Sequence, residues 1–389
     1  MSQFDKNMKI MVLSGDKENL ITVIKCLKKL DFTKITHSDN GVEAIQKMVV
    51  DPVDFILCDQ DIRFLKGWVF IKEMKNSDKI PNIPVILFGK ANAPESEEIM
   101  KQYGVIQYLK FPISDSNLDF AIHSTLTLFN TSGTTENKFS KAKTALLHQN
   151  STAVDLYQEL RGLTKNSTRS SLGLAQAYVQ NNEQEKASKV LQEVVATGDI
   201  TPSTRIIGIK LALEQKNTEN ANQLSTSLLT EQDNIFYYSR CVDLFIEASE
   251  FMSAENYCVQ AIEKDFLVPQ FHTNLAKCKY GQDKYPDCIN VLNEAEKKFG
   301  PSYEISNIRG VCYKKTGSFT EAIESYEEAL QLEPMNPKAY FNIAICLIEM
   351  SRFEEAIQQL EACLKMAPTF KRASEKLVEL KAKVGEPAA

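Results

Sequence analysis

Three cysteines, Cys278, Cys312 and Cys346, recur at a spacing of 34 residues, and cysteine is a common zinc ligand. A shared zinc ion would need each sulfur within about 2.3 Å of the metal. Equivalent positions on successive helical repeats lie farther apart than the ~8–10 Å between neighbouring helices. Cysteine also packs well as a small apolar side chain. We therefore predict that these cysteines fill the core and bind no metal.

The other residue types that commonly carry catalysis are scattered along the chain. The histidines lie far apart in sequence, and none has a partner at ligand spacing: His37, His123, His148 and His272. The sequence contains no GxGxxG, P-loop, GxSxG or HExxH motif. We predict that the chain is not an enzyme.

The composition is typical of a folded and mildly acidic chain of 389 residues. Apolar residues make up 43%, enough for a sizeable core, and the net charge is −6. Nucleic acid is disfavoured as a partner because phosphate binding needs a basic face. We see no secretory signal, no membrane-spanning run and no CxxC pair among the nine cysteines, and we expect a cytoplasmic protein with no membrane partner.

Short apolar runs alternate with helical patterns over the first 130 residues. The runs predict strands at 10–13, 34–37, 55–58, 84–88 and 107–111. The patterns between them predict helices at 20–30, 41–50, 68–74, 94–103 and 117–128. This alternation predicts a doubly wound α/β fold with a five-stranded parallel sheet. Sites in such sheets lie at the carboxyl ends of the strands, where Asp59 follows the central run.

An ordered set of motifs resembles the receiver domain of bacterial response regulators, which take part in two-component signalling and phosphorelays. The motifs are Asp54-Phe-Ile-Leu-Cys-Asp59, Gly67, Ile83-Pro-Val-Ile-Leu-Phe and Tyr108-Leu-Lys-Phe-Pro112, with Asn40-Gly-Val-Glu-Ala at the expected start of the second helix. The resemblance covers about residues 8–129 and implies a flavodoxin-like domain. By this resemblance Asp59 matches the aspartate that accepts a phosphoryl group from a histidine kinase, and Tyr108 matches the switch aromatic.

The chain departs from that family around the phosphoacceptor position. The family has an acidic pair directly after the first strand, but this chain has Ser14-Gly15, and Asp16 comes one step later. Gly89 stands at the family's threonine or serine position. Lys110 comes one residue before the family's lysine position, and a one-residue offset in a strand points a side chain to the opposite face. We predict a degenerate receiver, or pseudo-receiver, that is not phosphorylated efficiently and takes no cofactor.

A phosphorylation-controlled response regulator is the alternative hypothesis. In that case Asp59 accepts phosphate, Mg²⁺ is held by Asp16, Asp59 and Asp61, and the phosphate controls binding by the rest of the chain. This hypothesis predicts Mg²⁺-dependent labelling of Asp59, whereas a pseudo-receiver predicts that Asp59→Ala changes little.

From residue 134 onward, helical patterns repeat with a period of 33 or 34 residues. Small residues align in one column: Ala153, Ala187, Ala221, Ala254, Cys288, Ala322 and Ala356. This period resembles the tetratricopeptide repeat, most clearly in the last two units. The resemblance implies an all-α solenoid of about seven repeats over 134–370, with a linker at 130–136 before it and a capping helix with a short tail at 371–389.

In the register of the repeat family, the first helix of each pair lines a concave groove. We predict that this groove binds peptides with acidic and apolar side chains. Its candidate lining residues are Lys210, Asp243, Lys277, Asn307, Val311, Lys314, Phe341 and Ile345. The chaperone-binding members of the family carry a set of lysines and asparagines that we do not find here.

Together the two resemblances predict a cytoplasmic signalling adaptor or scaffold without catalysis. One protein partner would bind the receiver surface and another the concave face of the repeats, with a gain set by effective concentration. A rival hypothesis places all function in the repeats and makes the receiver a homodimerisation unit. RNA binding by the repeats is a more distant hypothesis and predicts strong salt dependence.

Overall fold

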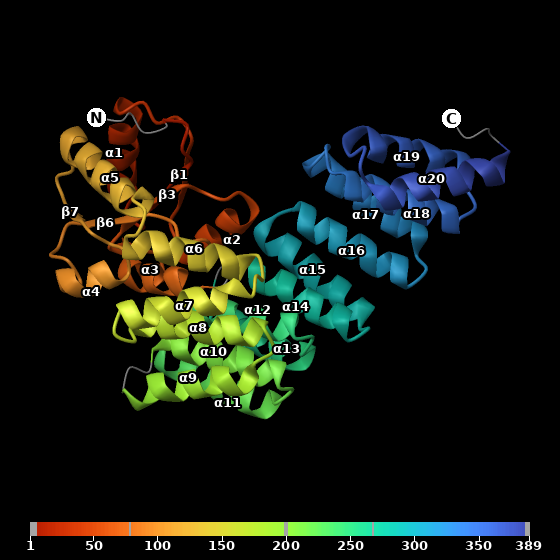
Figure 1. Cartoon of the computed structure of the whole chain (residues 1–389). Helices are drawn as coiled ribbons and strands as arrows, with labels where there is room; N and C mark the ends of the chain where they lie inside the picture. The colour runs from red at the N-terminus through yellow and green to blue at the C-terminus, as the bar shows by residue number, and fades with distance from the viewer. Residues whose placement is uncertain (1–5, 78, 198–200, 267, 386–389) are drawn as a thin grey trace. The chain divides into compact units, whose positions relative to one another are not determined.

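The computed structural model describes residues 6–77, 79–197, 201–266 and 268–385 (Figure 1). The chain divides into two compact units, Met1–Cys241 and Val242–Ala389, and each unit contains its own buried cores. Among the helices that the structure describes, none is long and apolar enough to cross a membrane.

The first unit begins with a five-stranded parallel sheet in the order β2-β1-β3-β6-β7. Its strands are β1 (Ile10–Leu13), β2 (Ile35–Ser38), β3 (Phe55–Asp59), β6 (Val85–Gly89) and β7 (Tyr108–Lys110). The central strands β3 and β6 are buried at every position, as expected for strands covered on both faces. The predicted doubly wound sheet is confirmed.

Five helices alternate with these strands: α1 (Lys17–Lys29), α2 (Gly41–Val50), α3 (Gly67–Asn76), α4 (Glu97–Gln102) and α5 (Asp115–Asn130). Helices α1 and α5 pack together over one side of the sheet, and their apolar side chains share a core with β1, β3 and β6. Helices α2 and α3 contact each other, and the ring of Phe70 leaves no room for a side chain at Gly41.

Two details of the α/β part differ from the sequence prediction. The helix expected at 94–103 is shorter, since Ser96 caps the first turn of α4 with its hydroxyl and the helix ends at Gln102. A small hairpin of β4 (Asp61–Ile62) and β5 (Leu65–Lys66) follows β3 and was not predicted. Two-residue strands are too short to produce a readable hydrophobic alternation.

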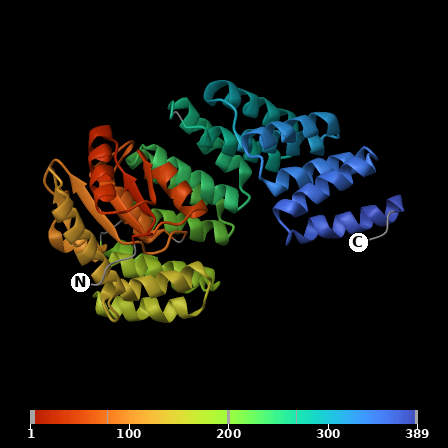
Figure 2. The same ribbon diagram turned by 90° about the horizontal axis from the view of Figure 1, so that it is seen from above.

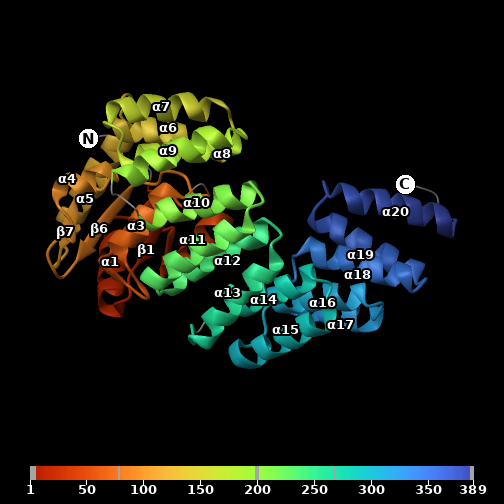
Figure 3. The same ribbon diagram turned by 90° about the horizontal axis from the view of Figure 1, so that it is seen from below.

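Helices in consecutive pairs make up the rest of the chain (Figures 1 and 3). In the first unit these are α6 (Thr135–Leu147), α7 (Thr152–Leu163), α8 (Thr168–Gln180), α9 (Gln184–Ala196), α10 (Pro202–Glu214) and α11 (Thr218–Glu231). Helix α12 (Ile235–Glu247) spans the boundary between the units. The second unit continues with α13 (Phe251–Glu263), α14 (Gln270–Gly281), α15 (Tyr285–Phe299), α16 (Tyr303–Lys315), α17 (Phe319–Leu332), α18 (Pro337–Glu349), α19 (Phe353–Met366) and α20 (Lys371–Val384).

Small residues allow the helices of these pairs to approach closely. Every member of the predicted column of small residues is buried: Ala153, Ala187, Ala221, Ala254, Cys288, Ala322 and Ala356. Two glycines have the same role, because a Cβ atom would lie 2.1 Å from the Tyr157 ring at Gly173 and 2.7 Å from the Tyr326 ring at Gly310. Each aromatic ring therefore occupies the space that a side chain on the facing helix would fill.

The segment expected as a linker, residues 130–136, is a short turn. Helix α5 runs to Asn130, the hydroxyl of Thr134 accepts a hydrogen bond from the N–H of Asn137, and α6 begins at Thr135. Helices α5 and α6 contact each other, and Glu136 is buried. The first compact unit continues beyond this turn to Cys241, so a free linker is not what the structure shows here.

Candidate functional site

Asp59 lies at the carboxyl end of β3 and is only 2% exposed. The Ser14 hydroxyl donates to Oδ2 of Asp59 at 2.6 Å, and the Asn19 side-chain amide donates to the same oxygen at 2.9 Å. The backbone N–H of Asp61 donates to Oδ1 at 3.1 Å. Both carboxylate oxygens therefore accept hydrogen bonds from neutral groups.

The donor set around Asp59 does not fit Mg²⁺. Asp16 accepts hydrogen bonds from the first turn of α1 and pairs with Lys90 at 2.7 Å, a contact that lowers the pKa of Asp16. The Asp61 side chain pairs with Lys66 on the exposed hairpin. Mg²⁺ needs several oxygen ligands that converge in near-octahedral geometry. No group of three or more carboxylate, histidine or cysteine side chains converges on one point within the described residues.

Backbone packing also closes the position where the receiver family has its second acidic residue. The N–H of Gly15 donates to the carbonyl oxygen of Asp61 at 3.0 Å. A Cβ atom at Gly15 would lie 3.1 Å from that oxygen and 3.1 Å from the N atom of Arg63. The β4–β5 hairpin is therefore packed tightly against Gly15.

The switch aromatic Tyr108 points toward the Asp59 end of the sheet. Its hydroxyl lies 2.6 Å from Oε1 of Gln60 and 3.0 Å from the carbonyl oxygen of Ala91. Burial, with the negative charge of Asp59 nearby, raises the pKa of Tyr108 to about 12. A Cβ atom at Gly89 would lie 2.6 Å from this hydroxyl, so glycine at the expected hydroxyl position makes room for the tyrosine.

The remaining lysine candidate lies away from the carboxylate. Lys110 donates to Oδ1 of Asn92 at 3.1 Å on the exposed surface. Phe111, at the position that the family gives to lysine, packs its ring against Phe88 with the centroids 5.9 Å apart. The structure therefore brings Asp59, Asp61 and Tyr108 to one end of the sheet and separates them from Lys110.

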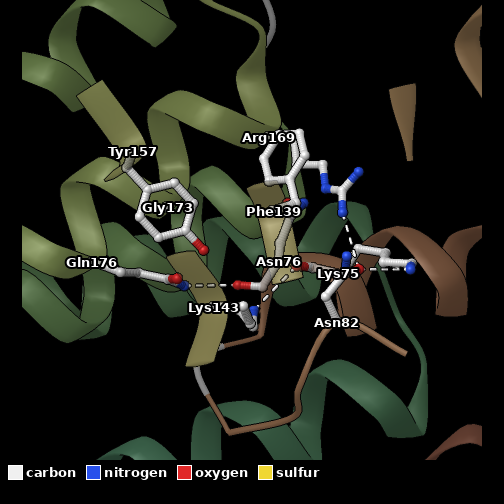
Figure 4. Close-up of a pocket in the computed structure, with 9 residues that line it drawn as sticks. All are labelled: Lys75, Asn76, Asn82, Phe139, Lys143, Tyr157, Arg169, Gly173 and Gln176. Atoms are coloured by element: carbon white, nitrogen blue, oxygen red, sulfur yellow. Dashed lines mark hydrogen bonds between the residues drawn. The ribbon is translucent and has the colours of Figure 1, made fainter. Parts of the chain in front are cut away.

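A second polar site joins the C-terminal end of α3 to the helical pairs (Figure 4). Lys143 of α6 donates to the carbonyl oxygens of Lys75 and Ser77. The Gln176 amide of α8 donates to the carbonyl oxygen of Asn76 at 2.7 Å. The last carbonyls of a helix lack partners within the helix and carry its negative dipole end. These side chains therefore cap α3 from outside its own domain.

Helices α10 and α12 complete this site. The Asn76 amide donates to the Ser203 hydroxyl at 3.1 Å, and the same hydroxyl donates to Oε2 of Glu73 at 2.9 Å. Tyr237 of α12 donates to Oε1 of Glu73 at 3.4 Å. The first helices of four successive pairs thus each bind the last turns of α3. We call this set of hydrogen bonds the α3 contact.

A buried ion pair lies beside the α3 contact. Arg169 of α8 makes a two-pronged pair with Glu136 of α6 at 2.6 and 3.1 Å, and both side chains are 4% exposed. The same guanidinium donates to Asn82 at 3.0 Å and lies 3.7 Å above the Phe139 ring. Burial alone would raise the pKa of Glu136, but Arg169 outweighs it and holds the pKa below its ordinary value. Asn82 in turn donates to Glu136 at 3.1 Å, which ties the α/β part to α6.

The predicted peptide-site residues fall on the first helices of the pairs. In the second unit, Val311, Phe341 and Ile345 belong to one apolar cluster. Lys314 donates to Asn342 at 3.4 Å, and burial with nearby Lys315 and Arg372 contributes to a lowered pKa of Lys314.

The other peptide-site candidates are scattered or already engaged. Lys277 pairs with Glu304 at 2.7 Å. The buried Oδ1 of Asn307 has no hydrogen-bond partner among the described residues. Lys210 and Asp243 lie on α10 and α12, and both already have interaction partners.

Sequence reasoning did not find the side chains that make the α3 contact, which are Glu73, Asn76, Lys143 and Ser203. These are ordinary polar residues on helices, and the pairs that bond are 66 to 130 residues apart in sequence. The cysteines behave as predicted in one respect, because Cys278, Cys312 and Cys346 are fully buried and free.

Comparison with known families assigns both parts of the chain. Residues 3–123 match the response regulator receiver domain, and residues 273–334 and 315–384 match tetratricopeptide repeats. The chain carries a receiver domain followed by tetratricopeptide repeats. The α/β part is therefore the receiver, and the helical pairs are the repeats.

Individual relatives resemble parts of this chain. Hsp70-Hsp90 organizing protein 1 of Glycine max is 24% identical over 199 residues, which cover 41% of this chain and 35% of that protein. A probable cyclic di-GMP phosphodiesterase of Vibrio cholerae is 27% identical over 142 residues, covering 36% of this chain and 29% of that protein. The chain thus spans only about a third of the length of these two relatives.

Solved structures with tetratricopeptide repeats also resemble it. A repeat protein of Parabacteroides merdae is 14% identical with a TM-score of 0.41, covering 64% of this chain and 98% of that one. A thermophilic repeat protein of Thermus thermophilus is 16% identical with a TM-score of 0.36, covering 46% of this chain and 98% of that one.

Proposed function

We propose that this protein is a cytoplasmic signalling adaptor that binds other proteins without catalysis and whose receiver domain works without phosphorylation. The observation that carries the proposal is the set of neutral donors on the buried Asp59 carboxylate. Ser14, Asn19 and the N–H of Asp61 already occupy its oxygens. A phosphoryl group would add negative charge where the nearest lysine, Lys90, already pairs with Asp16.

The repeats supply the protein-binding part of the proposal. In the second unit an apolar surface from Val311, Phe341 and Ile345 lies near the cation of Lys314. This combination suits a peptide that carries apolar side chains next to a carboxylate. The Hsp70-Hsp90 organizing proteins among the relatives support a role in holding proteins together.

Phosphorylation is tested on the full chain. We would incubate it with Mg²⁺ and acetyl phosphate beside a folded Asp59→Ala variant and measure intact mass. We expect no phosphoryl mass gain in either protein. A gain in the unmodified chain that is lost in Asp59→Ala would contradict the proposal.

Partner binding is tested by crosslinking from the proposed surface. A photoreactive amino acid at position 345 is compared with one at position 354, an exposed position on the neighbouring helix α19. We expect a protein adduct from position 345 only. Equal adducts from both positions, or none from position 345, would argue against this surface.

A phosphorylation switch is the second candidate, and one observation favours it. Helix α3 begins directly against the acceptor, since the Gly67 N–H donates to the carbonyl of Gln60 at 2.9 Å and a Cβ there would lie 1.9 Å from the carbonyl oxygen of Asp59. The same helix ends in the repeats, so a change at Asp59 has a direct route to them. Under this candidate, phosphoryl gain is accompanied by loosening of α3.

A further inference from the structure

Glu73 is the one carboxyl that the receiver places inside the α3 contact. It lies on α3, is 7% exposed, and accepts hydrogen bonds from Ser203 of α10 and Tyr237 of α12. The receiver side chain is therefore enclosed by two helices of the repeats.

The charges that face Glu73 do not compensate its burial. Burial raises the pKa of Glu73 from its ordinary 4.5 to about 7, while Ser203, Arg240, Lys72 and Tyr237 act in the opposite direction with smaller effect. Arg240 lies on α12, and Lys72 lies one residue away on α3, over the rings of Trp68 and Tyr103. These are the charged and titratable groups that face it from α3, α10 and α12.

We propose that the α3 contact is a proton-dependent latch, in which protonated Glu73 keeps the receiver docked on α10 and α12 and ionised Glu73 loosens it. The latch acts through a proton and needs no phosphoryl group. It would set how firmly the receiver holds the first repeats.

The direction follows from the two states of the carboxyl. In the open state Glu73 is in water and loses its proton near its ordinary pKa, whereas in the docked state it keeps the proton up to about pH 7. Docking is therefore firmest at low pH and weakens as pH rises toward 7. The opening equilibrium should rise roughly tenfold between pH 6 and 8 and change little above that.

The neighbouring Glu136 gives a contrast within the same region. Arg169 keeps its pKa low, so Glu136 remains ionised across this pH range. The pH dependence of the contact should thus come from Glu73 alone of the two buried carboxyls.

The test is hydrogen exchange on the full chain, followed in peptides from α3 and α10 and corrected for the intrinsic pH dependence of exchange. We expect protection to fall roughly tenfold from pH 6 to pH 8. Glu73→Gln keeps the shape and removes the charge, so its protection should not vary with pH. Glu18→Gln, an exposed change on α1, serves as the matched control and should behave as the unmodified chain.

Two outcomes would overturn the latch: constant protection in the unmodified chain, or the same pH dependence in Glu73→Gln. If Glu73→Gln does not fold, the unmodified chain labelled with ¹³C-glutamate decides the matter by NMR titration. One glutamate should titrate near pH 7, and a chain in which every glutamate titrates below pH 5.5 would overturn the proposal.

Discussion

The carboxylate of Asp59 accepts hydrogen bonds from a hydroxyl, an amide and a backbone N–H, each of which stabilises its charge without adding one. Two of these donors come from the start of the chain, Ser14 after β1 and Asn19 in the first turn of α1. The negative charge is therefore stabilised by local polar groups in a buried place.

Asn19→Ala should be costly for this reason. It removes a donor to a buried charge, and such hydrogen bonds contribute about 1.5–3 kcal/mol. We expect the free energy of unfolding to fall by that amount in urea titrations. The exposed change Ser116→Ala should stay within about 0.5 kcal/mol. Equal effects of the two changes would show that the hydrogen bond to Asp59 contributes little.

At the scale of the elements, the helical pairs depend on positions where no side chain fits. Gly310 of α16 faces the ring of Tyr326, whereas a Cβ atom at Gly162 of α7 would have no neighbour within 4 Å. The same substitution at these two glycines therefore tests packing against helix propensity.

Gly310→Ala should destabilise the repeats by about 1–3 kcal/mol, because the new methyl group would overlap the Tyr326 ring. Gly162→Ala should instead stabilise the first unit by up to about 1 kcal/mol, since alanine loses less backbone entropy in a helix. Thermal unfolding of both variants measures these opposite signs. Two shifts in the same direction would refute the packing argument.

The α3 contact is the second feature at this scale. Lys143→Met keeps the length of the side chain but leaves two buried carbonyls of α3 without their donor. We expect a loss of about 1–3 kcal/mol in the free energy of unfolding and faster hydrogen exchange in α3. Lys141→Met, an exposed change on the same helix, is the control and should leave α3 exchange unchanged.

These elements differ in how far the sequence predicts them. The repeat helices follow from the column that runs from Ala153 to Ala356, because close helix crossings need small residues at a fixed period. The departures at Ser14 and Gly15 were also visible, since strand ends locate the acceptor. The donor Asn19 was missed because one polar residue in a helix carries no sign of its partner. The α3 contact was missed for the same reason.

At the scale of the whole molecule, the first compact unit combines the receiver with the first repeats (Figure 2). The turn at 130–136 joins them, but the hydrogen bonds of the α3 contact and of Asn82 also cross between them. Covalent continuity at this turn is therefore only one of the connections.

A chain cut at this turn should remain in one piece. We would insert a protease site after Gly133, where a Cβ atom would meet nothing within 4 Å, and cleave the folded protein. The fragments should elute together in size exclusion near pH 6, because buried polar groups on each side keep their partners. Separate elution of folded fragments would show that the covalent link holds the receiver in place.

The α3 contact also bears on the ancestry of this domain arrangement. Glu73 and Asn76 are buried polar residues whose partners are supplied by another domain. A receiver recombined onto an unrelated protein would bring these residues without Ser203, Gln176 and Lys143. Substitutions on α3 should therefore be matched by substitutions on α6, α8 and α10 in descendants of this gene, so that the two domains are inherited as a pair and not as interchangeable modules.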